Sequence, residues 1–245
     1  MVMISVVVPV FNSRDTLEIL CQRLRETFAE LILDYEIVLV DDGSVDDSFS
    51  KMIELHAKDL KVKIIQLKRN YGQQNALMCG LRYVTGEYTV IMDDDLQNPP
   101  EEIAKLWFKI SQGYDVVYGL PAPAIKKVQG YRYWGGRLRD FLFDLMINKP
   151  PGIKVSSFRI LKRELVEEII KDRTSFVYIS AMTFKHKVKA ANIEVEHHQR
   201  EYGHSNYSMI KLAWLYLKIL LNYGPGFSRL AGSSRPQYEI AKIKL

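Results

Sequence analysis

The chain has 245 residues, of which 47% are hydrophobic and 26% are charged, so it is long enough to bury the core of one full α/β domain. The composition is ordinary for a globular protein and contains no low-complexity tract or internal repeat. Cys21 and Cys79 both lie in helix-like patterns, which excludes a disulfide framework and indicates a reducing compartment. Because the first residues are apolar and lack a basic leader, we expect a strand there, not a signal peptide, and a cytosolic location.

The formal net charge of +5 is divided unevenly along the chain. Residues 1–120 contain 12 Lys/Arg and 19 Asp/Glu, a net charge of −7, whereas residues 121–245 contain 22 and 10, a net charge of +12. An acidic half suits cation binding, and a basic half suits an anionic partner such as phosphate, lipid headgroups or nucleic acid. A solvated basic surface would account for the same charge, so composition alone does not distinguish an anion-binding surface from a solvated one.

Strand-like and helix-like segments alternate along the first half of the chain. The strand patterns cover residues 3–10, 35–41, 62–67, 87–92 and 114–119, and the helical patterns cover 14–31, 46–58, 73–84 and 100–112. This alternation predicts a parallel sheet with helices on both faces. Ligands of such sheets bind beyond the carboxyl ends of the strands.

Polar residues follow four consecutive predicted strands at the point where each strand ends. They are Pro9 to Asn12, Asp41 to Ser44, Arg69 to Gly72, and Asp93 to Gln97. Since the carboxyl ends of parallel strands meet at one edge of the sheet, we expect these four segments to line one crevice.

The triplet Asp93-Asp94-Asp95 lies between the apolar run 88–92 and the proline pair Pro99-Pro100. This order predicts a strand, an acidic loop and a helix start. Side chains alternate in an extended chain, so Asp93 and Asp95 face one way and can share a hard cation such as Mg²⁺ or Mn²⁺, while Asp94 faces the other way. The alternative is a solvated acidic loop that caps the following helix; the place of the triplet among four strand ends favours the metal site.

The second Asp pair also has two interpretations. Asp41 or Asp42 can accept hydrogen bonds from a base or ribose, or the pair can belong to a turn and helix cap with Asp46 and Asp47. The glycine fingerprints of dinucleotide-binding and P-loop enzymes are absent, which counts against hydride transfer and ATP hydrolysis. The spacing of His197, His198 and His204 matches no common zinc site, so surface or supporting roles are expected.

The pattern changes after residue 120. In residues 131–147 aromatic and aliphatic residues alternate with arginines at helical spacing, which predicts a helix that lies on a membrane surface or packs on the sheet. Residues 207–223 form a second such stretch, which includes two lysines and is shorter than the roughly 20 apolar residues of a spanning helix. We therefore expect it to be interfacial, followed by an irregular tail.

Five ordered motifs resemble family 2 glycosyltransferases of the GT-A fold, in particular the branch of dolichyl-phosphate mannose synthase and the bacterial polyprenyl-phosphate glycosyltransferases. They read VVPVFN, VDDGS, LKRNYGQQNAL, MDDDLQNPPE and FRIL, and begin at Val7, Val40, Leu67, Met92 and Phe158. The resemblance covers roughly residues 3–223. It implies a Rossmann-like α/β fold whose mostly parallel sheet is flanked by helices, with amphipathic, membrane-interfacial helices toward the C-terminus.

The resemblance also implies a role for each matching residue. The residues expected to bind the nucleotide are Pro9, Phe11, Asn12, Asp41, Asp42, Arg69 and Asp94. Metal and diphosphate would be held by Asp93, Asp95 and Gln97, with Mg²⁺ or Mn²⁺ as the cofactor. Arg200 and Ser205 match a segment that closes over the phosphates, and the expected catalytic residues are Asp93, Asp95 and Arg200.

Three departures from the family pattern bear on the acceptor. The chain has Gly119-Leu120-Pro121 where many relatives carry an arginine, so that phosphate or acceptor contact is either missing or supplied by Lys126 or Lys127, and Asn206 replaces a lysine found in parts of the family. Ser157 stands where some relatives have an acid, which removes an obvious general base. An alcohol acceptor needs such a base, whereas a lipid phosphate is already anionic at neutral pH. Ser157 is therefore expected on the acceptor or phosphate side of the site.

The sequence thus predicts an inverting, metal-dependent hexosyltransferase that moves a sugar from a UDP- or GDP-sugar to a membrane polyprenyl phosphate. Residues 1–205 would form the catalytic domain, with a nucleotide-sugar half at 1–120 and an acceptor half at 121–205, followed by a juxtamembrane helix at 206–223 and an irregular tail at 224–245. We expect it at the cytoplasmic face of the membrane, peripheral or anchored by a part outside this chain. Nucleic acid is not expected as a partner, and a homo-oligomer is left open.

Three alternatives remain at this point. The acceptor could be a hydroxyl of a growing glycan or glycolipid, with Asp144 or Glu201 as the base. A nucleotidyltransferase also uses carboxylates at sheet ends, although the glycine-rich loop of those enzymes is missing after the first strand. A non-catalytic module that binds nucleotide or anionic lipid would show no metal-dependent turnover.

Overall fold

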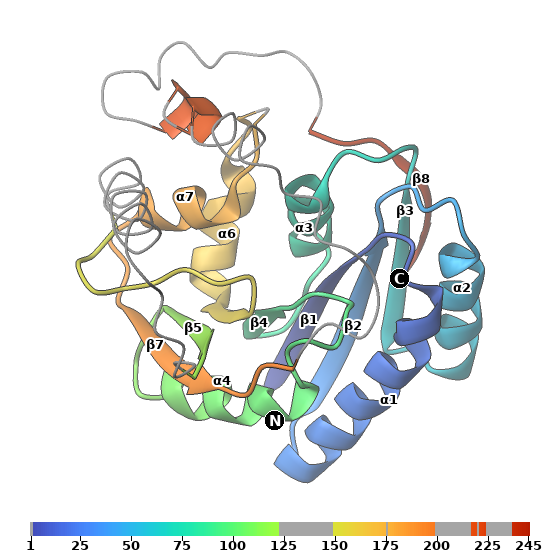
Figure 1. The fold of residues 1–245 in the computed structure, drawn as a ribbon, viewed down its shortest axis with the longest axis horizontal. Coiled ribbons are helices and arrows are strands. Elements are labelled where there is room, and N and C mark those ends of the chain that lie inside the picture. The colour runs from blue at the N-terminus through green and yellow to red at the C-terminus, as the bar shows by residue number, and fades with distance from the viewer. Residues whose placement is uncertain (1, 123–148, 175, 199–216, 220, 224–236) are drawn as a thin grey trace, which may run out of the picture.

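A computed structural model describes residues 2–122, 149–174, 176–198, 217–219, 221–223 and 237–245. Within these residues eight strands form a single sheet in the order β7-β5-β6-β4-β1-β2-β3-β8 (Figure 1). The strands are β1 (Met3–Val10), β2 (Asp34–Asp41), β3 (Val62–Leu67), β4 (Tyr88–Ile91), β5 (Val116–Pro121), β6 (Arg159–Lys162), β7 (Ala190–Val195) and β8 (Ile240–Lys244). The helices are α1 (Arg14–Leu31), α2 (Ser48–Lys58), α3 (Gln73–Leu81), the 3-10 turn η1 (Pro100–Glu102), α4 (Ile103–Ile110), α6 (Arg163–Lys171) and α7 (Ile179–Phe184).

The four central strands β4, β1, β2 and β3 are parallel neighbours, as the sequence predicts. Val7 of β1 lies in register between Val38 of β2 and Ile91 of β4, so the carboxyl ends of these strands meet at one edge. The sheet as a whole is mixed, because β6 runs antiparallel between β4 and β5, and β8 runs antiparallel along the outer side of β3.

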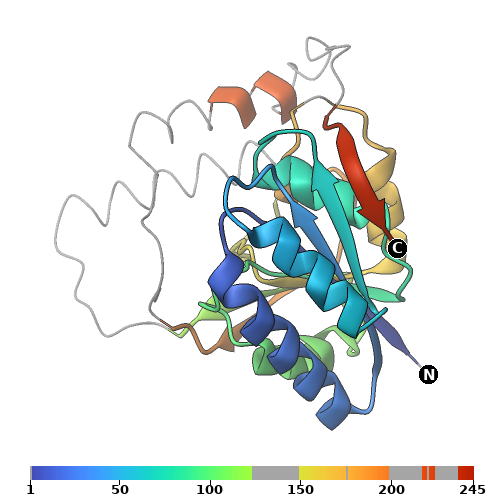
Figure 2. The same cartoon turned by 90° about the vertical axis from the view of Figure 1, so that its right-hand side faces the viewer.

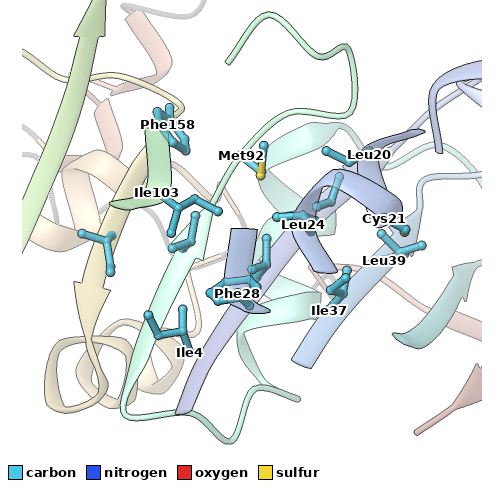
Figure 3. Packing of buried hydrophobic residues seen from close by; sticks show 14 of the residues in the cluster. Ile4, Leu20, Cys21, Leu24, Phe28, Ile37, Leu39, Met92, Ile103 and Phe158 are labelled. Carbon is cyan, nitrogen blue, oxygen red and sulfur yellow. The ribbon is translucent and has the colours of Figure 1, made fainter. Parts of the chain in front are cut away.

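Two apolar layers cover the sheet. On one face α1, α2 and α4 pack against the strands; Figure 3 shows Leu20, Leu24 and Phe28 of α1 near Ile4 and Ile37 of the sheet. These α1 residues are four positions apart, the spacing that puts one side of a helix on a core. Helices α3, α6 and α7 cover the opposite face (Figure 1). Both free cysteines are buried in these layers, which confirms that they are core residues.

All predicted elements in the first half are present; β1, β3 and α1 match their predicted bounds in full, and most of the others differ by one or two residues. The helix predicted over 73–84 ends earlier, at Leu81, and the one predicted over 100–112 begins with η1. The amphipathic stretch 131–147 and the first part of 207–223 lie outside the described residues. Among the residues that are described, no helix is long and apolar enough to cross a bilayer.

The irregular tail predicted over 224–245 is wrong for its last residues, because β8 is a strand (Figure 2). Lys242 and Lys244 alternate with Ile243 and Leu245, a pattern too short to predict a strand without knowledge of its partner. The open side of β3 supplies that partner, pairing Ile65 with Ile243. Gln237, which precedes β8 in the chain, holds this segment in place by donating from Nε2 to the carbonyl of Thr174 (2.8 Å).

Candidate active site

The turns that follow β1 and β2 are joined by hydrogen bonds. The Asn12 amide donates to Ser44 Oγ (3.0 Å), and the Val45 amide donates to Asn12 Oδ1 (2.9 Å). Asn12 has a φ of 55°, a left-handed conformation that asparagine tolerates better than most residues. The turn leaves the neighbouring Phe11 on the surface, 46% exposed, just beyond the end of β1.

Asp41 and Asp42 are both buried and join β2 to its neighbours. Asp41 accepts from the Ser44 amide (3.0 Å) and from Gln66 Nε2 (3.2 Å). Asp42 accepts from the amides of Tyr71 (2.7 Å) and Gly72 (2.8 Å) after β3. Burial raises the pKa of Asp42 to about 6, against the effect of these two donors. The helix-cap role does not apply to Asp42, and direct contact of either residue with a nucleoside stays a prediction.

The loop after β3 lies directly on the turn after β2. At Gly43, where φ is 72°, an added Cβ would lie 2.5 Å from the carbonyl carbon of Arg69 and 2.6 Å from the Asn70 nitrogen. Only glycine permits this approach of two backbones. The Arg69 side chain is exposed, and its guanidinium lies 5.0 Å from the centre of the Tyr71 ring, so its charge is available at the strand ends.

The first two carboxylates of the acidic loop reach opposite sides, as alternation predicts. Asp93 Oδ1 accepts from Gln73 Nε2 of α3 (2.5 Å). Asp94 instead faces the turn after β1, where its Oδ2 accepts from the Phe11 amide (3.3 Å) and its carboxylate from the Ser13 side chain. Burial, with Asp93 and Asp95 adjacent, raises the pKa of Asp94 to about 6.

Asp95 and Gln97 lie in a tight turn beyond the strand. Asp95 Oδ1 accepts from the Gln97 amide (3.2 Å), and Leu96 between them has a φ of 59°. Alternation of side chains through Asp95 requires an extended chain, whereas β4 ends at Ile91. A common cation bound by Asp93 and Asp95 therefore stays a prediction.

The loop has the chemistry of a divalent-cation site shared with a diphosphate. Three adjacent carboxylates supply hard oxygen donors, and the negative charges of Asp93 and Asp95 add to the effect of burial in raising the pKa of Asp94, a charge repulsion that a cation would relieve. No cluster of three or more metal-binding side chains is arranged within the described parts of the chain.

The predicted acceptor-side residue Ser157 lies at the acidic loop. Ser157 Oγ is 2.7 Å from Asp93 Oδ2, the oxygen opposite the one that Gln73 contacts. The Ser157 hydroxyl therefore donates to the Asp93 carboxylate. An ionised acid at this position could not do so, because it has no proton to donate. The buried guanidinium of Arg159 holds the backbone next to Ser157, with Nη1 donating to Ser180 Oγ (2.8 Å) and to the Ser156 carbonyl (3.5 Å).

The chain after β7 returns to the same loop. The amide of His198 donates to the Gln97 carbonyl (2.8 Å), and His197 Nδ1 lies 3.3 Å from Asn98 Oδ1. These contacts agree with the supporting role expected for the two histidines. Several predicted residues lie outside the described chain, so their positions stay predictions: Arg200, Ser205, Asn206, His204, Lys126, Lys127, Asp144 and Glu201.

Two residues at the site, Gln73 and Ser13, were not predicted from the sequence, and Ser44 was expected there only as part of the segment after β2. Ser44 and Gln73 stand inside motifs named above, but their hydrogen-bond partners come from other strand ends. Pro9 is buried near the end of β1, next to Val40 of β2, and shapes the edge from within the sheet.

A family model described as glycosyl transferase family 2 matches residues 5–170. Among curated proteins, the chain is 36% identical over 225 residues to an undecaprenyl-phosphate 4-deoxy-4-formamido-L-arabinose transferase of Proteus mirabilis. It is 38% identical over 220 residues to the protein of the same name from Erwinia tasmaniensis. Each match covers 89% of this chain but only 66% of the relative, so the chain spans just under two thirds of their length.

Solved structures of glucosyl-3-phosphoglycerate synthase from Mycobacterium tuberculosis have a similar fold. The complex with Mn²⁺ and UDP-glucose is 19% identical, with a TM-score of 0.59 over 98% of this chain and 86% of that one. The complex that also holds phosphoglyceric acid has a TM-score of 0.61 over 95% and 81%. At this level of identity the likeness establishes the GT-A-like α/β architecture alone.

Proposed function

This chain belongs to glycosyl transferase family 2, and from that premise we propose that it moves a sugar from a nucleoside-diphosphate sugar to the phosphate of a membrane polyprenyl carrier. The observation that carries the proposal is the meeting of the acidic loop, Ser157 and four strand ends at one edge of the sheet. The names of the relatives support an undecaprenyl-phosphate acceptor. Because this chain spans only part of their length, the acceptor is a proposal.

The donor nucleotide would lie across the ends of β1, β2 and β3. Phe11 offers an exposed ring on which a base can stack, and Asn12 stands beside it. Arg69 offers an exposed guanidinium for phosphate, and Pro9, Asp41 and Asp42 shape the strand ends behind them. UDP-sugars and GDP-sugars both fit this description, so the nucleotide base of the donor is to be identified by the transfer assay.

The diphosphate would lie at the acidic loop, where Asp93 and Asp95, with Gln97, would hold Mg²⁺ or Mn²⁺. A divalent cation there would neutralise the charge that develops on the leaving nucleoside diphosphate. Arg200 and Ser205 would close over the phosphates from the segment that follows His198, whose backbone pairs with Gln97. Asp94 holds the turn after β1 in place and would approach the nucleotide from the opposite side.

Ser157 favours a phosphate acceptor over a hydroxyl. Its hydroxyl donates to Asp93, so this position does not offer a base to deprotonate an alcohol. A phosphate monoester needs no base, because its oxygen is already anionic at neutral pH. One such oxygen would form the new bond to the anomeric carbon while the bond from that carbon to the nucleoside diphosphate breaks, which inverts the configuration.

A membrane contact is supported by the residues just before the tail. Ile219 is buried in the core, whereas Leu217 and Leu221 on either side of it are 43% and 41% exposed. Lys218, between them, lies 6.0 Å from the centre of the Phe176 ring. We propose that Leu217 and Leu221 contact lipid at the cytoplasmic face, near the end of the expected juxtamembrane helix. In this arrangement residues 1–120 would bind the nucleotide-sugar donor and residues 121–205 would bind the lipid acceptor.

The test is transfer by the purified chain. Mn²⁺, undecaprenyl phosphate in detergent and a panel of radiolabelled UDP- and GDP-sugars would be incubated with it, and the label extracted into an organic phase. We expect metal-dependent label in the lipid phase with at least one donor. Label found only in a water-soluble glycoside would contradict the phosphate acceptor, and release of pyrophosphate would indicate a nucleotidyltransferase.

A further inference from the structure

Gln73 connects α3 to the acidic loop through a side-chain hydrogen bond. It is the first residue of α3, it is exposed, and its Nε2 donates to Asp93 Oδ1 across 2.5 Å. Asp93 is thereby held at both oxygens, by the amide of Gln73 on one and the hydroxyl of Ser157 on the other. The two donors come from different halves of the chain, since Gln73 precedes and Ser157 follows residue 120.

The position of Gln73 is fixed by the buried carboxylate of Asp42. The Gly72 amide donates to Asp42 Oδ2 (2.8 Å) and also lies 3.1 Å from Asn70 Oδ1. Gly72 has a φ of 91°, which glycine adopts without strain, and its carbonyl accepts from the Asn75 amide (2.9 Å) to begin the helix. The start of α3 is thus anchored to β2 immediately before Gln73.

We infer that Gln73 is a positioning residue for the divalent cation: it orients Asp93 so that the carboxylate receives the metal in one geometry. This inference rests on the proposed function. Each carboxylate oxygen has two lone pairs, so Oδ1 can accept from Gln73 and still ligate a cation. A neutral amide leaves the full negative charge of Asp93 for the cation, whereas a lysine at this distance would neutralise it. Partners of this kind typically change metal affinity or activity by about 10- to 100-fold when they are lost.

The test compares Mn²⁺ binding by four full-length proteins: wild type, Gln73→Met, Gln73→Asn and Gln22→Met. Methionine keeps the length of glutamine without the donor, and asparagine keeps the amide but is too short to reach Asp93. Gln22 is a matched control, since it too is exposed and donates through Nε2 to a carboxylate, Glu26, across 2.9 Å on α1. The bound fraction of Mn²⁺ would be measured by electron paramagnetic resonance without nucleotide, and then with UDP.

Both Gln73 variants should raise the dissociation constant for Mn²⁺ by about tenfold, while Gln22→Met stays within about twofold of wild type. Because Gln73 is exposed, all four unfolding midpoints should agree within about 2 °C, which separates loss of positioning from loss of fold. In the transfer assay, the Mn²⁺ concentration for half-maximal rate should rise by a similar factor. The rate at saturating Mn²⁺ should be close to that of wild type. A merely structural role would not produce a changed Mn²⁺ requirement together with an unchanged maximal rate.

Unchanged Mn²⁺ affinity in both Gln73 variants would overturn the inference and leave the proposed function intact. A rate that falls and is not recovered at high Mn²⁺ would also overturn it, because Gln73 would then act elsewhere than through the cation. Failure of wild type to bind Mn²⁺ with or without UDP would contradict both the inference and the metal site of the proposed function.

Discussion

Substitution of Gly43 by alanine tests whether the turn after β2 and the loop after β3 are in direct backbone contact. The new Cβ would lie 2.5 Å, 2.6 Å and 2.9 Å from backbone atoms of Arg69 and Asn70, where no flexible side chain can move away. The φ of 72° adds a conformational cost of about 1–2 kcal/mol for a residue with a Cβ. Relief of the overlap by a backbone shift costs about 1–3 kcal/mol more, so we expect a total loss of about 2–5 kcal/mol.

Gly113→Ala is the matched control, because Gly113 also has a positive φ, 95°, but an added Cβ would meet no atom within 4 Å. It should lose only the conformational part, about 1–2 kcal/mol. Urea unfolding of wild type and both variants, followed by circular dichroism, gives the free energies of unfolding. If Gly43→Ala were no less stable than Gly113→Ala, the contact between the two strand ends would be wrong, and with it the anchoring of Arg69 at the site.

Three further predictions concern the site, its pH response and the membrane. Asp95→Asn should reduce transfer by about 10³-fold with the fold retained, whereas Asp47→Asn, at the exposed N-cap of α2, should leave transfer unchanged; near-wild-type activity of Asp95→Asn would refute the metal assignment. The raised pKa of Asp42, about 6, means that its stabilising effect is full below about pH 4 and is lost as pH rises through 6. The free energy of unfolding of Asp42→Asn should therefore decline less than that of wild type between pH 4 and 7, with the rest of the decline left to Asp94, and an unchanged slope would contradict this. Leu217→Ser with Leu221→Ser should weaken sedimentation with anionic vesicles by about tenfold, and equal binding would remove these residues from the membrane contact.

The central strands and their parallel arrangement could be predicted because local patterns and general sheet rules agree there. Apolar runs that end on polar residues gave β1 to β4, and the preference of ligands for carboxyl ends placed those polar residues in one crevice. Alternation also assigned Asp93 and Asp94 to opposite sides of the chain, which their separate partners confirm.

Contacts between distant segments could not be predicted from the same patterns. Nothing in the sequence pairs Gln73 with Asp93 or Ser157 with Asp93, because each pair depends on how strand ends come together in space. The buried state of Asp41 and Asp42 was missed for a related reason: a polar pair after a strand suggests a surface turn, and only neighbouring amides make burial acceptable. β8 needed the open side of β3 to become a strand.

The central claim is that a phosphate oxygen of a lipid carrier displaces a nucleoside diphosphate from a sugar at the acidic loop. The most direct measurement is mass spectrometry of both products from one reaction of the full chain with Mn²⁺, undecaprenyl phosphate and the donor selected by the panel. We predict equal amounts of a lipid monophosphate that carries one sugar and of nucleoside diphosphate. A lipid diphosphate sugar with nucleoside monophosphate, or free nucleoside diphosphate beside an unmodified lipid, would contradict it.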